Sequence, residues 1–245
     1  MTEQFKTADL PEEAQQFLLG VYERAKARVD GVIKRHGMRP GLSAAMAVER
    51  IAILDHEIRP VFPALEAAGT AIACAKGCSF CCTLTIDVTP DEAFALVDYL
   101  DHQLPTETVA AIKARAVLAD ARGHGMEPLA RHSLQIACPV MDPETKACLG
   151  HAARPTACQG YLSLDVKRCE AVHAGTGQGV PQPTAANMLT NVVSHTRAYA
   201  LEDAGAPRQS LELTAALLAA WADPDAERRW LEGETVMTEA ASYQA

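Results

Sequence analysis

The cysteines of this chain are bunched, and that bunching constrains its fold more than any other feature. Four of the eight fall within nine residues: Cys74, Cys78, Cys81 and Cys82. Four more follow at a distance: Cys138, Cys148, Cys158 and Cys169. The long segments that flank the first group contain no cysteine. Because a metal ion or cluster needs several thiolates within a short reach, this pattern predicts metal ligation by the eight cysteines.

Disulfide bonding and simple core packing fit the cysteine pattern less well than metal ligation does. Disulfides need an oxidising compartment, but the first residues, Met-Thr-Glu-Gln-Phe-Lys-Thr, lack the basic start and apolar run of a secretory signal. We therefore expect a cytoplasmic protein with reduced thiols. Cys81 and Cys82 could bond to each other only through a strained ring. Cysteines that merely pack in a core lie on apolar helical faces, and none of the eight is expected on one. A redox-active thiol cluster is the remaining alternative to metal.

The spacing of the cysteines also bears on how the metal is held. Structural zinc sites commonly use two compact C-x2-C pairs, and only the first group here is compact. Adjacent cysteines point their side chains in different directions, so Cys81 and Cys82 would strain to reach one ion. We infer that the later cysteines complete the first group, in either two interleaved centres or one polynuclear centre. Cys138-Pro139 favours iron–sulfur over zinc, because proline follows a ligand cysteine in ferredoxin-type runs.

One spacing points to a different chemistry. Cys74-x3-Cys78-x2-Cys81 matches the spacing with which radical S-adenosylmethionine enzymes hold a cluster that has one open iron. Those enzymes resemble a β/α barrel in which the motif follows an early strand. This chain offers one convincing strand and many helices, and Cys82 is an additional thiol, so the context argues against that family.

Helical periodicity dominates the rest of the chain, so the expected fold is mainly α with at most a small β-sheet. The expected helices cover residues 11–36, 43 into the 60s, 89–105, 106–122, 184–202, 210–222 and 224–232. Pro60 and Pro63 should kink or split the second of these helices. Thr89 and Glu92 predict a capping box at the start of the third. Residues 83–88 are the best strand candidate, because they are rich in β-branched side chains.

We expect one domain over residues 1–245, with an N-terminal helical hairpin at 11–70, a cysteine-cluster metal-binding core at 71–183 and C-terminal helices at 184–235. From Met126 to Pro183, prolines and glycines are frequent and apolar periodicity is lost. A segment of this kind cannot satisfy its backbone polar groups in regular ladders. Metal coordination is therefore expected to hold it in place.

The net charge limits the partners. The chain has 22 Lys and Arg against 31 Asp and Glu, which gives a formal net charge of −9 and an isoelectric point near 5.4. That charge repels phosphate backbones and anionic lipids, and no basic stripe with interleaved aromatic residues offsets it. The sequence also lacks an apolar run long enough to span a membrane. We therefore expect neither nucleic acid nor a membrane as a partner, while a protein or peptide partner and the oligomeric state stay open.

Several motifs follow one another in a fixed order. They are Cys74-x3-Cys78-x2-Cys81-Cys82, the short strand with the Thr89-x-x-Glu92 helix start, Cys138-Pro139, Cys148, Arg154-Pro155-x-x-Cys158 and Cys169. This ordered set resembles the YkgJ-type cysteine-cluster family, which is described as chelating zinc or iron. The resemblance spans about Cys74 to Cys169. At Cys148-Leu-Gly-His151 the chain departs from the family, which often has a tyrosine at the fourth place.

The resemblance implies metal chelation by these eight cysteines. A similar cluster in flagellin lysine methylase is associated with iron–sulfur binding, which again favours an iron–sulfur cluster over zinc. The expected function is binding of an iron–sulfur cluster or zinc through the eight cysteines, in a structural, redox or metal-handling role. Two alternatives stay open, namely a cluster-dependent enzyme that modifies a protein or peptide, and a metallochaperone. The sequence leaves open whether the chain is an enzyme.

Three further residues lie among the later cysteines. Arg154 can either offset thiolate charge and donate hydrogen bonds to sulfur, or be an exposed arginine before a turn. His151 and His173 can each replace a thiolate at a metal, although an exposed loop histidine is the commoner role. The glycine-rich run at residues 175–179 does not follow a strand, so we expect a flexible loop rather than a nucleotide-binding loop.

Overall fold

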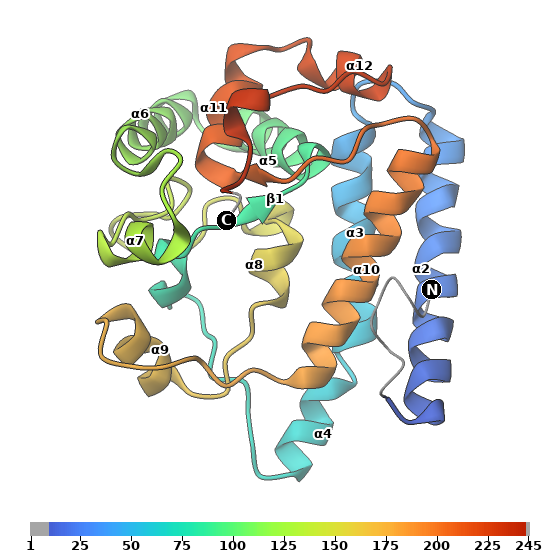
Figure 1. Cartoon of the computed structure of the whole chain (residues 1–245), viewed down its shortest axis with the longest axis vertical. Coiled ribbons are helices and arrows are strands. Elements are labelled where there is room, and N and C mark those ends of the chain that lie inside the picture. Colours follow the sequence, from blue (N-terminus) through green and yellow to red (C-terminus); the bar gives the residue numbers. More distant parts are fainter. Residues whose placement is uncertain (1–9, 244–245) are drawn as a thin grey trace.

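The fold is mainly α-helical, as predicted, in the computed structural model, which describes residues 10–243. The first seven residues, which argued against a secretory signal, lie outside this range. Three long helices lie side by side: α2 (Glu12–His36), α3 (Leu42–Ile58) and α10 (Thr184–Asp203) (Figure 1). Among the described residues, no helix is long and apolar enough to cross a membrane.

Helix α2 buries a single stripe of side chains. The buried residues recur at steps of three and four: Leu18, Val21, Ala25, Val29 and Val32. Such steps fall on one helical face, because an α-helix has about 3.6 residues per turn. The helix packs against both α3 and α10. Helices α2, α3 and α10 therefore pack together, although α10 is far from the other two in sequence.

The second predicted helix is split, as expected. Helix α3 ends at Ile58, and α4 (Val61–Ala67) follows after Arg59 and Pro60. Pro60 has no backbone N–H to donate, and its ring conflicts with the carbonyl group one turn earlier, so the helix cannot continue straight. Pro63 lies in the first turn of α4, where an N–H has no intrahelical partner.

Helix α5 (Pro90–Gln103) begins at the predicted capping box. The Thr89 side chain accepts from a backbone N–H in the first turn, and the Glu92 carboxylate accepts from the backbone N–H of Thr89 at 3.2 Å. These reciprocal bonds fix where the helix starts. Helix α5 packs against α3 and against α11 (Leu213–Ala222), and therefore joins the N-terminal and C-terminal parts of the chain.

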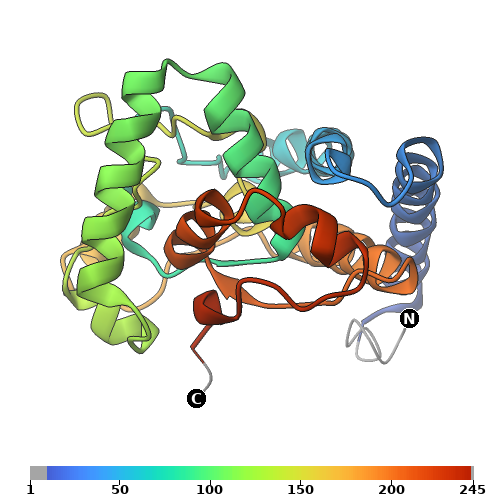
Figure 2. The ribbon, with the colours of Figure 1, turned by 90° about the horizontal axis from the view of Figure 1, so that it is seen from above.

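Two further helices lie at one end of the molecule. Helix α6 (Thr106–Gly123) packs on α11, and α12 (Ala226–Leu231) packs on α5 (Figure 2). Both were predicted from the sequence, over residues 106–122 and 224–232. The helix predicted from residue 210 begins later, because the residues before it form strand β2 (Leu211–Glu212). A 3-10 turn, η3 (Thr238–Ala240), packs on α11 near the C-terminus.

The strand predicted over residues 83–88 is mostly wrong. Only β1 (Asp87–Val88) is a strand, and it pairs antiparallel with β2. The chain before it forms a 3-10 turn, η1 (Phe80–Thr83). Backbone N–H groups in and just after this turn bond to carbonyl groups three residues back. The turn around the adjacent cysteines therefore takes the place of most of the β-strand that the β-branched residues predicted.

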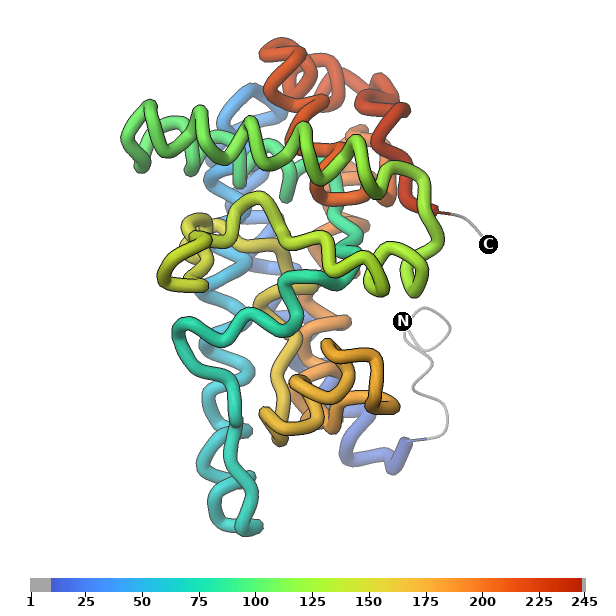
Figure 3. The backbone as a smooth tube through the Cα atoms, turned by 90° about the vertical axis from the view of Figure 1, so that its left-hand side faces the viewer, coloured from blue at the N-terminus to red at the C-terminus, as the bar shows by residue number. Residues whose placement is uncertain are grey.

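The segment from 126 to 183 is less irregular than predicted. It contains four short helical pieces: α7 (Pro128–Ser133), η2 (His151–Ala153), α8 (Thr156–Gly160) and α9 (Val166–His173). None of them exceeds eight residues, and turns connect them. The stretch that follows α7 runs beside the chain of η1 and β1, although the two are far apart in sequence (Figure 3).

Candidate metal centre

The two groups of cysteines meet around η1. The backbone N–H of Cys138 donates to the carbonyl oxygen of Cys82 at 2.7 Å, and α9, which carries Cys169, packs against η1. All eight cysteines are free thiols. Within residues 10–243, no three Cys, His, Asp or Glu side chains are arranged to hold a metal ion as they stand. The structure therefore gives the neighbours of each thiol, while the ligand set stays a prediction.

Ser163 joins the first cysteine to the last. Its backbone N–H donates to Sγ of Cys74 at 3.2 Å, and Sγ of Cys169 donates to its Oγ at 3.0 Å. A backbone bond of 2.8 Å from Ala73 to the carbonyl of Ser163 aligns the two segments. Cys169 is the buried residue of α9, so the expectation that no cysteine lies on a packed helical face is wrong for this one.

Cys82, Cys138 and Cys148 lie close together beside η1. Besides the bond between Cys138 and Cys82, an isolated antiparallel bridge joins Met141 to Cys148. Cys138 and Cys148 thus lie on the two arms of one tight hairpin, and both pack against the main hydrophobic core. Cys158 lies on the short helix α8, which packs against β1 and α10.

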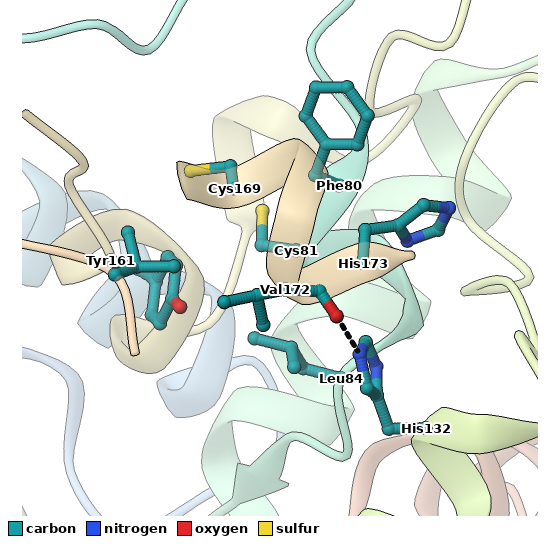
Figure 4. Close-up of a pocket in the computed structure, with 9 residues that line it drawn as sticks. Phe80, Cys81, Leu84, His132, Tyr161, Cys169, Val172 and His173 are labelled. Carbon is teal, nitrogen blue, oxygen red and sulfur yellow. Dashed lines mark hydrogen bonds between the residues drawn. The ribbon is translucent and has the colours of Figure 1, made fainter. Parts of the chain in front are cut away.

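A pocket opens beside the first group of thiols (Figure 4). Its lining residues are Phe80, Cys81, Leu84, His132, Tyr161, Cys169, Val172, His173 and Val180. Aromatic and aliphatic side chains therefore surround two thiols and two imidazoles. The sequence indicated His173 through its position after Cys169, but it gave no signal for His132, which stands outside every motif.

The two imidazoles share the hydroxyl group of Thr83, which is 5% exposed. Its Oγ1 lies 3.3 Å from Nδ1 of His132 and 3.2 Å from Nδ1 of His173. Nε2 of His132 lies 3.2 Å from the carbonyl oxygen of Val172, which can only accept, so this nitrogen carries the proton (Figure 4). Oγ1 of Thr83 also donates to the carbonyl oxygen of Phe80 at 3.2 Å, so this carbonyl and Nδ1 of His132 compete for the one hydroxyl proton.

Burial makes several of the thiols poor acids. It raises the pKa of Cys138 to about 12 and the pKa of Cys158 well above its usual range, and neighbouring thiols add to both effects. It also raises the pKa of Cys74, although the backbone N–H of Ser163 acts in the opposite direction. Each thiolate would carry its charge in a medium of low dielectric close to other thiolates. A metal cation offsets the cost of burying these negative charges, because its positive charge stabilises the deprotonated thiols that coordinate it.

Arg154 places a positive charge beside the thiols. Hydrogen bonding with Cys82 lowers the pKa of Cys81 to about 7, and Arg154 contributes in the same direction. At Cys148, burial raises the pKa and Arg154 opposes it. Nη1 of Arg154 donates to Nε2 of His151 at 2.7 Å, so this ring nitrogen is engaged. Of the two roles weighed for Arg154, its lowering influence on the pKa of both Cys81 and Cys148 favours charge compensation.

Residues 73–174 match the family model named CxxCxxCC, whose description reads "Putative zinc- or iron-chelating domain". We call this segment the CxxCxxCC domain, after the family to which it is similar. It contains all eight cysteines and agrees with the cysteine-cluster family predicted from the motifs. No curated protein and no solved structure matches the chain. The family description supports a zinc- or iron-chelating role for the domain.

Gly77 shapes the first loop of the CxxCxxCC domain. Its φ is +88°, a left-handed conformation that other residues disfavour, and a Cβ atom there would lie 3.3 Å from the carbonyl oxygen of Thr145. The backbone N–H of Cys78 bonds to the carbonyl of Ala75 at 3.0 Å. The loop between the first two cysteines therefore turns tightly and lies against the loop that leads to Cys148.

A buried ionic cluster at the start of α5 was not predicted. Arg50, Asp91, Glu92 and Arg197 are 1%, 3%, 4% and 0% exposed. Arg197 on α10 pairs with Asp91, and its Nη2 lies 3.3 Å from Oε1 of Glu92. Arg50 on α3 lies 3.9 Å from the same oxygen. Two positive and two negative charges balance, which limits the penalty of burying them. The sequence signal for this cluster was an arginine on the mostly apolar face of each of the two helices, α3 and α10.

The same cluster holds helix α8 of the CxxCxxCC domain. Oε1 of Glu92 accepts from the backbone N–H and the hydroxyl of Thr156, at 2.8 and 2.5 Å. Nη2 of Arg50 donates to the carbonyl oxygen of Arg154 at 2.8 Å, and its Nη1 donates to Oε1 of Gln159 at 3.2 Å. Buried charges of α3 and α5 thus fix the chain on both sides of the seventh cysteine.

Proposed function

We propose that the protein binds metal through the thiolates of all eight cysteines of its CxxCxxCC domain, as an iron–sulfur cluster or as zinc. The observation that carries this proposal is the meeting of the two cysteine groups around η1, where the Cys138 amide is bonded to the Cys82 carbonyl. Thiolates are preferred ligands of both zinc and iron–sulfur clusters. The family description independently supports chelation of zinc or iron.

The donor set fits such a group chemically. All eight thiols are free, and the backbone N–H of Ser163 already points at the sulfur of Cys74. Hydrogen bonds of this kind to sulfur tune iron–sulfur clusters. Because no three potential ligands in the described part of the chain converge as they stand, binding requires the cysteine-bearing loops to close. Coupling of this kind between metal binding and local folding is common in small metal domains.

An iron–sulfur cluster is preferred over zinc. Cys138-Pro139 resembles the cysteine–proline step of ferredoxin-type runs, and the later cysteines do not form the second compact pair that zinc sites commonly use. The bound metal would serve one of three roles: structural cross-linking, electron transfer or metal handling. The structural role has direct support in the fold, since the helices of the segment from 126 to 183 are too short to be stable alone.

Anaerobic purification followed by elemental analysis tests the proposal. Iron and sulfide in matching amounts, with a brown colour from visible sulfur-to-iron absorption, would select an iron–sulfur cluster. A colourless protein with stoichiometric zinc would select zinc and refute the preference for iron–sulfur. A correctly folded protein that holds neither metal, and that does not take up either one from solution, would refute metal binding itself.

A second candidate function is a cluster-dependent enzyme that modifies a protein or peptide. The pocket beside Cys81 and Cys169 favours it, since two imidazoles and aromatic side chains give a small substrate group both polar and apolar contacts. Cyanide is a suitable probe, because it binds an iron ion that has an open site. A shift of the visible spectrum by cyanide, lost when Leu84→Trp fills the pocket, would support the enzyme. An unchanged spectrum would contradict it.

A further inference from the structure

We propose that helix α6 joins two copies of this chain, which pair their α6 helices antiparallel about a twofold axis at Ala114. The contact uses the solvent-facing side of the helix, which we call the α6 outer face. Its members are exposed apolar residues: Ala110, Ala111, Ala114, Val117, Leu118 and Ala121. This surface contains none of the eight cysteines, so the inference is independent of the metal centre.

Helix α6 is apolar on two opposite faces. Its inner face packs against α11, and its buried residues are Val109, Ile112, Ala116, Ala119 and Gly123. At about 100° per residue, the outer face lies within about 60° on either side of Ala114. Its two large side chains, Val117 and Leu118, are 56% and 66% exposed. A helix that is apolar all round is normally covered on all sides, so the outer face indicates a missing partner.

The charged side chains next to the outer face turn toward the body of the molecule. Nζ of Lys113 lies over the ring of Trp221 on α11, 4.9 Å from its centroid. On the other flank, Nε of Arg115 donates to the carbonyl oxygen of Pro139 at 3.0 Å. Helix α6 itself runs along one side of the molecule, with α5 and α11 on its inner side (Figure 2). The outer face is therefore both apolar and open to a second copy.

The outer face is complementary in shape to itself when two copies run antiparallel. Its residues recur at steps of four, three and four, as in the seam of a coiled coil. In an antiparallel pair centred on Ala114, Val117 of one copy faces Ala110 of the other, and Leu118 faces Ala111. Each large side chain thus meets a small one, and the alanines let the helices approach to about 8 Å. A parallel pair would instead place Leu118 against Leu118 and alanine against alanine, which leaves gaps.

The charges at the ends of the outer face select the same arrangement. Glu107 lies in the first turn of α6 and Arg122 in the last, and both are exposed. Nη2 of Arg122 donates to the carbonyl oxygen of Leu134 at 3.2 Å, and the guanidinium group keeps further N–H groups to donate. Antiparallel pairing brings Glu107 of each copy to Arg122 of the other. Parallel pairing would bring like charges together, so the charges favour the antiparallel orientation.

Sedimentation velocity of the full-length protein tests the proposal. The measurement is made anaerobically with a reductant, so that the free thiols do not cross-link copies. An interface of one helix per copy is small, so we expect a dimer with a dissociation constant in the micromolar range. Wild-type protein that stays monomeric up to about 1 mM would overturn the proposal and leave the outer face to a different protein.

Ala114→Arg places two guanidinium groups at the twofold axis and should raise the dissociation constant at least about 30-fold. Ala52→Arg is the matched control, because Ala52 is also an exposed alanine within a long helix, on α3, and this variant should dimerise like the wild type. Circular dichroism checks that both variants stay folded. Unchanged dimerisation of Ala114→Arg would overturn the proposal, since the contact would then lie elsewhere.

Two charge reversals test the antiparallel register. Glu107→Arg and Arg122→Glu each create two like-charge pairs, so each variant alone should dimerise about tenfold more weakly than the wild type. In an equimolar mixture the two variants form a heterodimer in which both pairs are again opposite in charge. The mixture should therefore dimerise at least as strongly as the wild type. A mixture that dimerises no better than the separate variants would overturn the antiparallel pairing.

Discussion

Glu92→Gln should destabilise the protein strongly at neutral pH, because it removes one of two negative charges from the buried ionic cluster. The Glu92 carboxylate faces Arg50 and Arg197 and accepts two hydrogen bonds from Thr156. In the variant, the two arginines retain only Asp91 as a counter-charge. Glutamine has nearly the same shape, so the variant changes the charge and leaves the packing almost intact.

The magnitude follows from the acidity of this carboxyl group. Burial alone would raise the pKa of Glu92, but Arg197, Arg50 and the bonds from Thr156 outweigh burial and lower it from 4.5 to about 2. Each pKa unit corresponds to about 1.4 kcal/mol, so the ionised carboxylate contributes about 3 kcal/mol to stability. Since the folded-state pKa is the lower one, this contribution is present above pH 4.5 and is lost as the pH falls toward 2.

Urea unfolding followed by circular dichroism measures the effect. Glu92→Gln should lower the free energy of unfolding by about 3 kcal/mol at pH 7, whereas Glu66→Gln, at an exposed site, should change it by less than about 0.5 kcal/mol. The difference between wild type and Glu92→Gln should shrink below pH 4.5, while acid release of metal affects both proteins alike. A difference below about 1 kcal/mol at pH 7, or one independent of pH, would refute the reasoning.

Three further variants probe the cysteine region. Gly77→Ala should lose about 1 to 2 kcal/mol of stability in urea, because it forces a side chain into a left-handed conformation against Thr145, and an unchanged midpoint would contradict this. Thr83→Val should lower the free energy of unfolding by about 1 to 3 kcal/mol and change the nitrogen-15 chemical shifts of the two imidazoles in the pocket. Thr85→Val is the control and should do neither, because the buried Thr85 hydroxyl has no hydrogen-bond partner. Arg154→Gln should weaken metal retention against a chelator about tenfold, and Arg154→Lys, which keeps the charge, should weaken it much less. Equal weakening of metal retention in the two variants would exclude a charge effect.

Much of the helical fold could be predicted because its signals are local. The apolar stripe of α2, the break at Pro60 and the capping box of Thr89 and Glu92 each depend on a few neighbouring residues. The strand over residues 83–88 failed because its partner, β2, is distant in the chain and only two residues long. Because only two residues of each strand can pair, the 3-10 turn that contains the adjacent cysteines determines the local structure.

The candidate site was only partly predictable, since its geometry depends on contacts between distant segments. The spacing identified the cysteines as ligand candidates, but the role of Ser163 between Cys74 and Cys169 could not be read from sequence. The same holds for His132, which reaches the pocket only because α7 lies beside η1 and α9. Side chains without a motif acquire a role only through the tertiary fold.

The charge balance of the CxxCxxCC domain is completed by helices outside it. Asp91 and Glu92 lie within residues 73–174, yet their counter-charges, Arg50 and Arg197, come from α3 and α10. A buried carboxylate without its partner costs several kcal/mol, so the start of α5 cannot be packed in this way by the domain alone. Because Arg50 also holds the carbonyl of Arg154, the same helices determine where the chain places Cys158. The flanking helices therefore belong to the architecture of the candidate metal centre itself.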